Sequence, residues 1–281
     1  MSFSVGDAQT VAQILRDAAD TEILPRFRHL SDGAIRQKTS AEDLVTDADE
    51  AAERMITAAL GKAFPGAVVI GEEAVSADET LLDHLEGADL AFVVDPVDGT
   101  KNFASGLTLF GVMAGVVVRG ETVGGIILDP VGGDWTIAVR GEGAWTETAD
   151  GGRNDLKVAK SKPVKQMSGT ASWSQLPEPT RSRVCANLAS TRSAANYRCA
   201  AHEYRMLAGG HSHFALFTKL TVWDHVAGWL IHQEAGGYSA RFDGSPYLAA
   251  HREGGLLCAS NEASWHELHA ALFAGTEHAR A

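Results

Sequence analysis

Apolar residues recur along the chain at helical spacing in some segments and in short continuous runs in others. Between residues 11 and 18 they stand at i, i+3, i+4 and i+7, which predicts an amphipathic helix that Pro25 ends or kinks. The same criterion predicts a second helix over residues 47–63, whereas the apolar runs 68–70 and 90–94 are typical of short buried strands. Both runs end on acidic residues. Because ligands usually bind at the carboxyl ends of strands in open α/β sheets, these ends are candidate functional positions.

The pattern changes in the middle of the chain. Residues 109–145 are rich in Val, Ile, Gly and Trp and contain three turn sequences, which predicts an antiparallel meander. A loop-rich segment, 148–163, separates this region from a C-terminal alternation of strands and helices. There we expect strands at 167–172 and 214–217 and helices at 179–189, 223–235 and 262–273.

These elements predict an α/β fold organised as a single domain. We expect an N-terminal α+β half (about 1–150) and a C-terminal α/β half (about 151–281). The length of 281 residues and a hydrophobic content of 45% suit one large core.

Charge and cysteine usage exclude several classes of protein. The 24 Lys+Arg against 36 Asp+Glu give a net charge of −12, which argues against binding to nucleic acid or to an anionic membrane. Three separated cysteines without a C-x-x-C pair are typical of a reducing compartment. No apolar run approaches the ~20 residues of a membrane helix, and no signal peptide is recognisable. We therefore expect a cytoplasmic protein.

The segment Asp95-Pro96-Val97-Asp98-Gly99-Thr100 places two carboxylates three residues apart where an apolar run ends. Carboxylates this close repel one another unless cations lie between them, and hard oxygen ligands suit Mg²⁺ or Mn²⁺. The alternative is an ordinary acidic surface turn, because Asp, Pro and Gly are common turn residues.

Other acidic residues stand at comparable positions. Glu72 ends the preceding strand, Asp49 lies at the start of the second helix, and Asp224 opens the helix at 223–235. For Asp49 and Asp224, the alternative is that each simply caps a helix.

Taken together, four separated motifs resemble the inositol monophosphatase family of Mg²⁺-dependent, typically lithium-sensitive phosphatases. The motifs are Lys38-x4-Asp43-x-Val45-Thr46-x2-Asp49, Gly71-Glu72-Glu73, Asp95-Pro96-x-Asp98-Gly99-Thr100 and Trp223-Asp224-x2-Ala227-Gly228. The resemblance implies a layered αβαβα sandwich of the inositol monophosphatase and fructose-bisphosphatase type. It also implies a homodimer that hydrolyses a small phosphate monoester by direct attack of water, without a covalent intermediate.

The resemblance assigns roles residue by residue. Two or three Mg²⁺ ions, with Mn²⁺ as an alternative, would be held by Glu72, Asp95, the Val97 carbonyl, Asp98 and Asp224. Asp49 would hold waters of the metal ions, Thr100 would pair with Asp49 to orient the attacking water, and Lys38 would supply a charge near the metals. The catalytic residues would then be Glu72, Asp49 and Thr100.

The substrate side departs from the family. The backbone amides of Gly99 and Thr100 would receive phosphate oxygens, and Ala200 and Asp224 would line the substrate. Arg198 and Phe217 stand where inositol-specific members have Gly and a Glu that contacts sugar hydroxyls. We expect both residues on strands that face the pocket, and the alternative is a surface salt bridge for the arginine and a core position for the phenylalanine.

Several functions therefore stay open. The substrate is a phosphorylated alcohol, with fructose 1,6-bisphosphate, 3′-phosphoadenosine 5′-phosphate and histidinol phosphate as alternatives to inositol phosphate. A binding or regulatory protein with incidental activity on the same scaffold is an alternative of another class. Zinc-site, P-loop, dinucleotide and serine-hydrolase motifs are absent from the sequence.

Overall fold

The computed structural model describes residues 3–31, 33–38 and 44–279. Its helices are α1 (Val5–Ala18), α2 (Asp47–Ala63), α3 (Glu72–Ala77), α4 (Thr100–Ala104), α5 (Thr180–Asn187), α6 (Ala200–Ala208), α7 (Val222–Glu234) and α8 (Glu262–Leu272). Its strands are β1 (Ile35–Gln37), β2 (Leu44–Thr46), β3 (Val68–Gly71), β4 (Ala91–Asp98), β5 (Gly111–Val118), β6 (Glu121–Asp129), β7 (Asp134–Val139), β8 (Gly143–Thr148), β9 (Arg153–Asp155), β10 (Ser168–Ala171), β11 (Ser193–Ala195), β12 (Phe214–Phe217), β13 (Tyr238–Arg241) and β14 (Leu256–Ala259).

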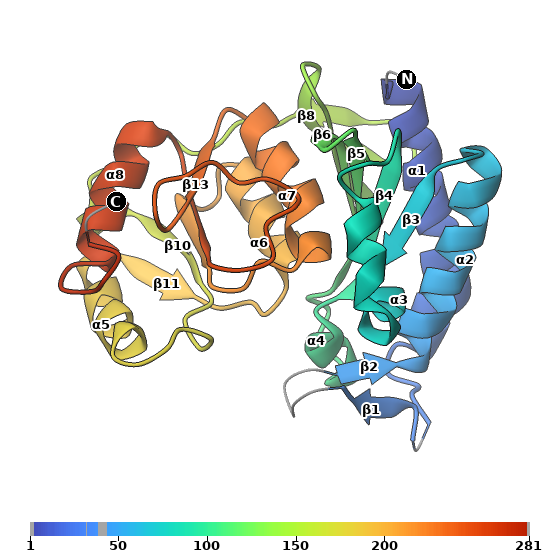
Figure 1. Ribbon diagram of the computed structural model, residues 1–281, viewed down its shortest axis with the longest axis horizontal. Coiled ribbons are helices and arrows are strands. Elements are labelled where there is room, and N and C mark those ends of the chain that lie inside the picture. The colour runs from blue at the N-terminus through green and yellow to red at the C-terminus, as the bar shows by residue number, and fades with distance from the viewer. Residues whose placement is uncertain (1–2, 32, 39–43, 280–281) are drawn as a thin grey trace.

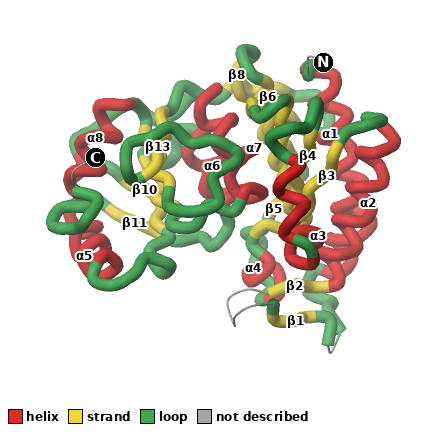
Figure 2. Tube along the Cα trace, viewed as in Figure 1, coloured by secondary structure: helices red, strands yellow, loops and turns green. Residues whose placement is uncertain are grey.

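Helices and sheets form five successive layers (Figure 1). Helices α1 and α2 cover one face of a seven-stranded sheet. Helices α6 and α7 lie between that sheet and a five-stranded sheet, and α5 and α8 cover the far face of the five-stranded sheet. The colouring by secondary structure makes the same alternation visible (Figure 2). The predicted αβαβα sandwich is thus confirmed.

The larger sheet follows the order of the chain. Its strands run β3-β4-β5-β6-β7-β8-β9, with β3 parallel to β4 and every later pair antiparallel. The predicted meander is therefore confirmed, because β5 to β8 occupy the expected segment. The smaller sheet has the order β11-β10-β12-β14-β13 and contains both parallel and antiparallel pairs.

Helix α7 lies close to the larger sheet because two glycines leave room for it. A Cβ atom on Gly115 of β5 would lie 2.4 Å from Val226 Cγ1, and one on Gly125 of β6 would lie 2.4 Å from the Ala227 carbonyl oxygen. No side chain larger than hydrogen fits at either position. This close approach brings the first turn of α7 toward the end of β4.

Strand β4 corrects one prediction. The apolar run was expected to end before the acidic motif, yet the strand continues to Asp98, with a register shift against β5 between Asp95 and Asp98. Pro96 has no N–H for the ladder, and the Val97 N–H donates to Asp95 Oδ1 at 3.0 Å. The bulge thus places both carboxylates on one irregular strand end.

Other elements were absent from the prediction. They are the hairpin β1–β2, the helices α3 and α6 and the strands β9, β11, β13 and β14. Arg198 was expected on a strand, but it lies in a turn before α6 with a φ of 52°. The segment expected to separate two halves contains β9, and that division of the chain stays a prediction. Among the described residues, no helix combines the length and the apolar character needed to cross a membrane.

Candidate active site

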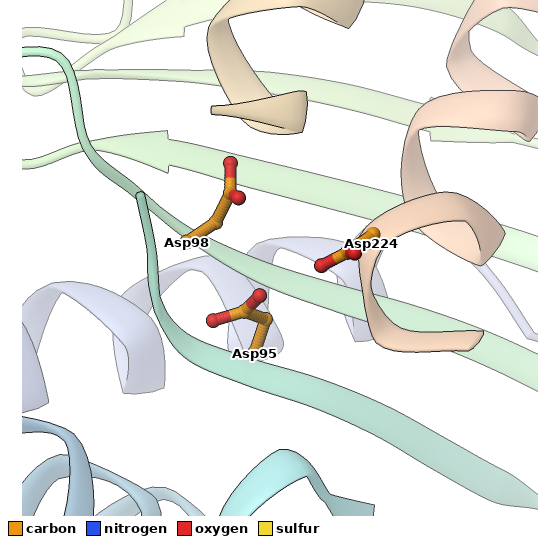
Figure 3. A group of neighbouring side chains, drawn as sticks. All are labelled: Asp95, Asp98 and Asp224. Carbon is orange, nitrogen blue, oxygen red and sulfur yellow. The ribbon is translucent and has the colours of Figure 1, made fainter. Parts of the chain in front are cut away.

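Three carboxylates meet between the end of β4 and the start of α7 (Figure 3). Asp95 and Asp98 come from β4 and Asp224 from the first turn of α7, and one oxygen of each lies within 4.8 Å of the others. Asp95 and Asp98 are buried. Three acidic side chains so close together in a partly dry cleft match the oxygen ligands that divalent cations prefer.

Each of these carboxylates is held by the protein through one oxygen. Asp98 Oδ2 accepts from the Ala201 N–H at 2.6 Å and from Cys199 Sγ at 3.0 Å, at the N-terminus of α6. Asp95 Oδ1 accepts from a backbone N–H of its own strand, and Asp224 Oδ2 accepts from the Thr221 hydroxyl. Within the part of the chain that the structure describes, the second oxygen of each carboxylate remains for a ligand.

Glu72 and Lys38 lie beside this cluster as a pair. Lys38 Nζ is 2.9 Å from Glu72 Oε1 and 2.7 Å from Glu73 Oε1. Glu72 is not within the 4.8 Å group, although it lines the same cleft of about 600 Å³ together with Asp95 and Asp98. Lys38 therefore lies beside the acidic cluster as expected, and the role of Glu72 as a metal ligand stays a prediction. Asp43 of the first motif lies outside the described residues.

Thr100 and Asp49 are in direct contact. Thr100 Oγ1 lies 3.0 Å from Asp49 Oδ1 and 3.0 Å from the Val97 carbonyl oxygen. Asp49 is fully buried, and its Oδ2 accepts from the N–H and the hydroxyl of Thr46, the residue that caps α2. The capping alternative for Asp49 is thus correct and coexists with the contact that the resemblance implies.

Burial raises the pKa values of four acidic side chains at the site, Asp49, Glu72, Asp95 and Asp98. Burial is the main cause in each case: it raises the pKa of Asp49 to about 6, of Asp98 to about 7 and of Glu72 to about 8. The pKa of Asp95 is raised well above its usual range by burial and by the neighbouring carboxylates. The protein supplies too little positive charge here to balance these groups, so the donor set fits bound divalent cations.

Comparisons with known proteins agree with this geometry. The model of the inositol monophosphatase family matches residues 2–278. The chain belongs to this family. It is 32% identical over 216 residues to the Nus factor SuhB of Pasteurella multocida (73% of this chain, 74% of the relative). It is 29% identical over 221 residues to an inositol-1-monophosphatase of Bacillus subtilis (76% and 78%).

Solved structures share the fold. The extragenic suppressor protein suhB from Bartonella henselae superimposes with a TM-score of 0.80 at 26% identity, covering 95% of this chain and 98% of that one. Membership of the inositol monophosphatase family supports a metal-dependent phosphatase. The acidic cluster is consistent with that class.

The predicted substrate residues border a second opening beside the acidic cluster, the substrate cleft, with a volume of about 530 Å³. Its lining includes Gly99, Thr100, Arg198, Ala200, Phe217 and Asp224. Phe217 is only 4% exposed and its ring stacks on Tyr204, with centroids 4.9 Å apart. Phe217 is therefore a core residue that also reaches the cleft. Arg198 and Phe217, the two residues that differ from the family, thus both line the cleft.

Glu53 is a residue of the site that the sequence analysis missed. Its carboxylate on α2 accepts from the N–H groups of Glu73 and Ala74 at 2.7 and 2.8 Å, at the N-terminus of α3. Helix α3 begins with Glu72, so Glu53 positions that side chain. The signal was present, because a glutamate one turn after Asp49 stands on the buried face of a helix.

Removing this support should loosen α3. We expect Glu53→Ala to lower the free energy of unfolding by about 1–3 kcal/mol, since two N–H groups lose their acceptor, and to weaken Mg²⁺ binding. Gly71→Ala should act similarly, because its Cβ would lie 2.2 Å from the Glu53 carboxyl carbon. Thermal unfolding and Mg²⁺ titration measure both effects, with Glu53→Gln, which keeps one acceptor, as the intermediate case. Unchanged stability in both Ala variants would contradict this role.

The raised pKa values predict an unusual pH dependence of the metal-free protein. Folded-state pKa values of about 6 to 8 lie above the unfolded values of about 4, so folding favours the protonated carboxyls. Their contribution to stability is fully present below the unfolded-state pKa of about 4 and is lost as the pH rises from there through the folded-state values of about 6 to 8. We expect the Tm in EDTA to fall over this range and the fall to shrink in millimolar Mg²⁺. A Tm in EDTA that rises between these pH values would refute the prediction, and Asp98→Asn should flatten the curve.

Proposed function

We propose that the protein is a Mg²⁺-dependent phosphomonoesterase that hydrolyses a small phosphorylated alcohol. The observation that carries this proposal is the convergence of Asp95, Asp98 and Asp224 within 4.8 Å, next to the contact between Thr100 and Asp49. We further propose that Glu72 completes the metal ligands together with the Val97 carbonyl. When bound, divalent ions would lower the pKa of a water, polarise the phosphoryl oxygens and stabilise the leaving alkoxide.

The residues of the chain orient the reactants. Thr100 has one hydroxyl proton and two acceptors at 3.0 Å, so its lone pairs remain free to accept a hydrogen bond from the attacking water. We propose that the N–H groups of Gly99 and Thr100, at the start of α4, receive phosphate oxygens. Gly99 has a φ of 84° and a Cβ there would lie 2.9 Å from the Leu109 carbonyl, so only glycine fits this turn.

The proposed reaction consumes one water for each ester. The water oxygen forms a bond to phosphorus while the bond from phosphorus to the ester oxygen breaks, and that oxygen takes a proton to leave as the alcohol. The other product is inorganic phosphate. No side chain becomes covalently attached to phosphorus.

The test is phosphate release from a panel of substrates. Inositol 1-phosphate, histidinol phosphate, fructose 1,6-bisphosphate and 3′-phosphoadenosine 5′-phosphate are compared with Mg²⁺ and with EDTA. We expect turnover of at least one substrate with Mg²⁺ and none with EDTA. Equal turnover in EDTA would overturn the assignment.

Inositol 1-phosphate should not be the best substrate. Phe217 lacks the carboxylate that would accept from sugar hydroxyls. The loss of one hydrogen bond of about 0.5–1.5 kcal/mol lowers kcat/KM by up to roughly tenfold. We expect Phe217→Glu or Arg198→Gly to raise the rank of this substrate. Arg198→Gly should preserve the fold, because a φ of 52° suits glycine better than arginine. The prediction fails if inositol 1-phosphate leads for the unmodified protein and neither change alters the ranking.

A second candidate function comes from the names of the relatives. Several similar proteins are called Nus factor SuhB, which favours a regulatory role beside or instead of catalysis. A strain that lacks this protein distinguishes the two. Rescue by a variant without phosphatase activity would support the regulatory role, whereas failure of that variant would support catalysis.

Three further properties are proposed from the family resemblance. They are inhibition by lithium, assembly as a homodimer and residence in the cytoplasm. We also propose that the whole chain works as a single phosphatase domain, since the carboxylates come from both β4 and α7.

A further inference from the structure

Three cationic side chains line the substrate cleft beside the acidic cluster: Lys101, Arg198 and Lys219. The last two are both exposed to solvent. Within the described part of the chain, neither has a carboxylate oxygen within the 4.0 Å of an ion pair. Lys38 differs from them, because Glu72 and Glu73 already take up its charge. Arg198 and Lys219 are therefore available to a ligand.

The loop that carries Lys219 is fixed to α7. The Lys219 carbonyl oxygen can only accept, so His225 Nε2, at 2.7 Å, must carry the proton of this bond. His225 Nδ1 then accepts from the Tyr204 hydroxyl at 3.0 Å. Because His225 directly follows Asp224, the same helix positions the acidic cluster and the backbone of Lys219.

Arg198 is held by an amide whose orientation is determined. Asn102 Nδ2 donates to the carbonyl oxygens of Leu109 and Tyr197 at 2.8 and 2.7 Å, so Asn102 Oδ1 is the atom that faces the arginine. Arg198 Nη2 donates to this oxygen at 2.9 Å. One N–H of the guanidinium is used in this way, and the others remain for a ligand.

The acidic residues around the cleft do not cancel these charges. Asp98, Asp224 and Glu72 belong to the proposed metal site. Glu203 is buried, its Oε1 accepts from the Tyr197 N–H at 3.0 Å, and burial raises its pKa to about 8. Burial thus favours the neutral form of Glu203, and this residue makes no ion pair with Arg198 or Lys219 in the part of the chain that the structure describes.

We propose that Arg198 and Lys219 bind a second anionic group, a phosphate or a carboxylate, on the alcohol part of the substrate. Both side chains offer donors and no acceptor, which suits an anion better than a neutral polyol that must also donate. The inference rests on the proposed phosphatase activity and specifies its substrate class: a phosphate monoester with a further negative charge.

Matched pairs of substrates test this proposal. Fructose 1,6-bisphosphate is compared with fructose 1-phosphate, and 3-phosphoglycerate with glycerol 3-phosphate. Each pair offers the same type of ester bond and differs in one anionic group, a phosphate in the first pair and a carboxylate in the second. We expect kcat/KM to favour the more anionic member of at least one pair by about tenfold or more, mainly through KM.

Two variants and a control locate the effect. Lys219→Ala and Arg198→Gly should each reduce this preference several-fold, because kcat/KM falls further for the more anionic substrate than for the less anionic one. Lys165→Ala removes the same charge from an exposed position outside the cleft and should leave the preference unchanged. Added salt should weaken the preference in the unmodified protein more than in either variant.

The outcomes separate the two proposals. Phosphate release without any preference, or a preference that survives both substitutions, would overturn the role of Arg198 and Lys219 and leave the phosphatase assignment intact. No phosphate release from any of the four substrates or from the wider panel would overturn the phosphatase assignment and this inference with it.

Discussion

Replacing Asp95 by Asn is expected to lower kcat/KM about a thousandfold and to raise the stability of the metal-free protein. Stabilisation by metal ions contributes several kcal/mol to such a reaction, and about 1.4 kcal/mol corresponds to a factor of ten. Asn is nearly isosteric with Asp, and its side-chain oxygen can still accept from the Val97 N–H at 3.0 Å. The fold should therefore persist while one ligand and one negative charge are lost.

The opposite signs of the two effects distinguish a metal ligand from a structural residue. In the metal-free protein the neighbouring carboxylates and burial raise the pKa of Asp95, so its charged form opposes folding. A residue needed only for structure would lose activity and stability together. Thermal unfolding with and without Mg²⁺ measures the second effect, and we expect Asp95→Asn to raise the Tm in EDTA and to reduce the shift produced by Mg²⁺.

Asp224→Asn should likewise lower the activity and reduce the Mg²⁺ shift, since Asp224 belongs to the same group of oxygens. Asp89→Asn is the matched control, because Asp89 is an exposed carboxylate that pairs with Arg119 at 2.8 Å. It should keep full activity and the full Mg²⁺ shift. If Asp95→Asn retains Mg²⁺-dependent turnover near that of the control, the proposed metal site is wrong.

The elements predicted correctly from the sequence are those in which the local pattern of apolar and capping residues favours the same structure as the tertiary contacts. Helix α2 has the expected bounds, because its apolar stripe, its capping box and the Phe64-Pro65-Gly66 stop all indicate the same segment. Strand β12 is likewise found at 214–217. The gathering of acidic residues could be anticipated because they follow strands or open helices whose ends meet at one edge.

Features that depend on distant contacts could not be read from the local pattern. Helix α6 carries His202, Glu203 and Arg205 among its apolar residues, and its start is defined by the bond from Ala201 N–H to Asp98, 103 positions earlier in the chain. The support of α3 by Glu53 is also a tertiary contact. Sequence periodicity records which face of an element is buried, and it does not record which polar group caps a helix from another element.

The position of Arg198 shows a related limit. Its segment was expected to be a strand, but the backbone turns there with a φ of 52°, and Asn196 Oδ1 accepts from the Arg198 N–H at 2.9 Å. Arginine is an uncommon residue at positive φ, so no propensity predicts this turn. The bond from Arg198 to Asn102 and the fixed orientation of Asn102 stabilise it. The backbone strain at this position is thus offset by tertiary bonds.

Replacing Thr100 by Ala is expected to lower kcat about a hundredfold with little change in KM. The Thr100 hydroxyl lies 3.0 Å from Asp49 Oδ1, and Asp49 is fixed through its other oxygen by Thr46. A hydroxyl held in this way can orient a water, and that interaction matters chiefly in the transition state. The substrate phosphate would still meet the backbone amides of the α4 start, which the substitution leaves in place.

Thr100→Ser separates orientation of the water from packing. Serine keeps the hydroxyl and loses only a methyl group, so this variant should recover most of the activity, whereas Thr100→Val keeps the volume without the hydroxyl and should resemble Thr100→Ala. Steady-state kinetics with saturating Mg²⁺ measures kcat and KM separately for the three variants. A large rise in KM with an unchanged kcat in Thr100→Ala would show that the hydroxyl binds substrate, and full activity of Thr100→Val would show that neither role applies. Asp49 loses its Thr100 donor in both the Ala and the Val variant. If these two variants lose kcat equally and Thr100→Ser recovers it, the effect belongs to the hydroxyl itself.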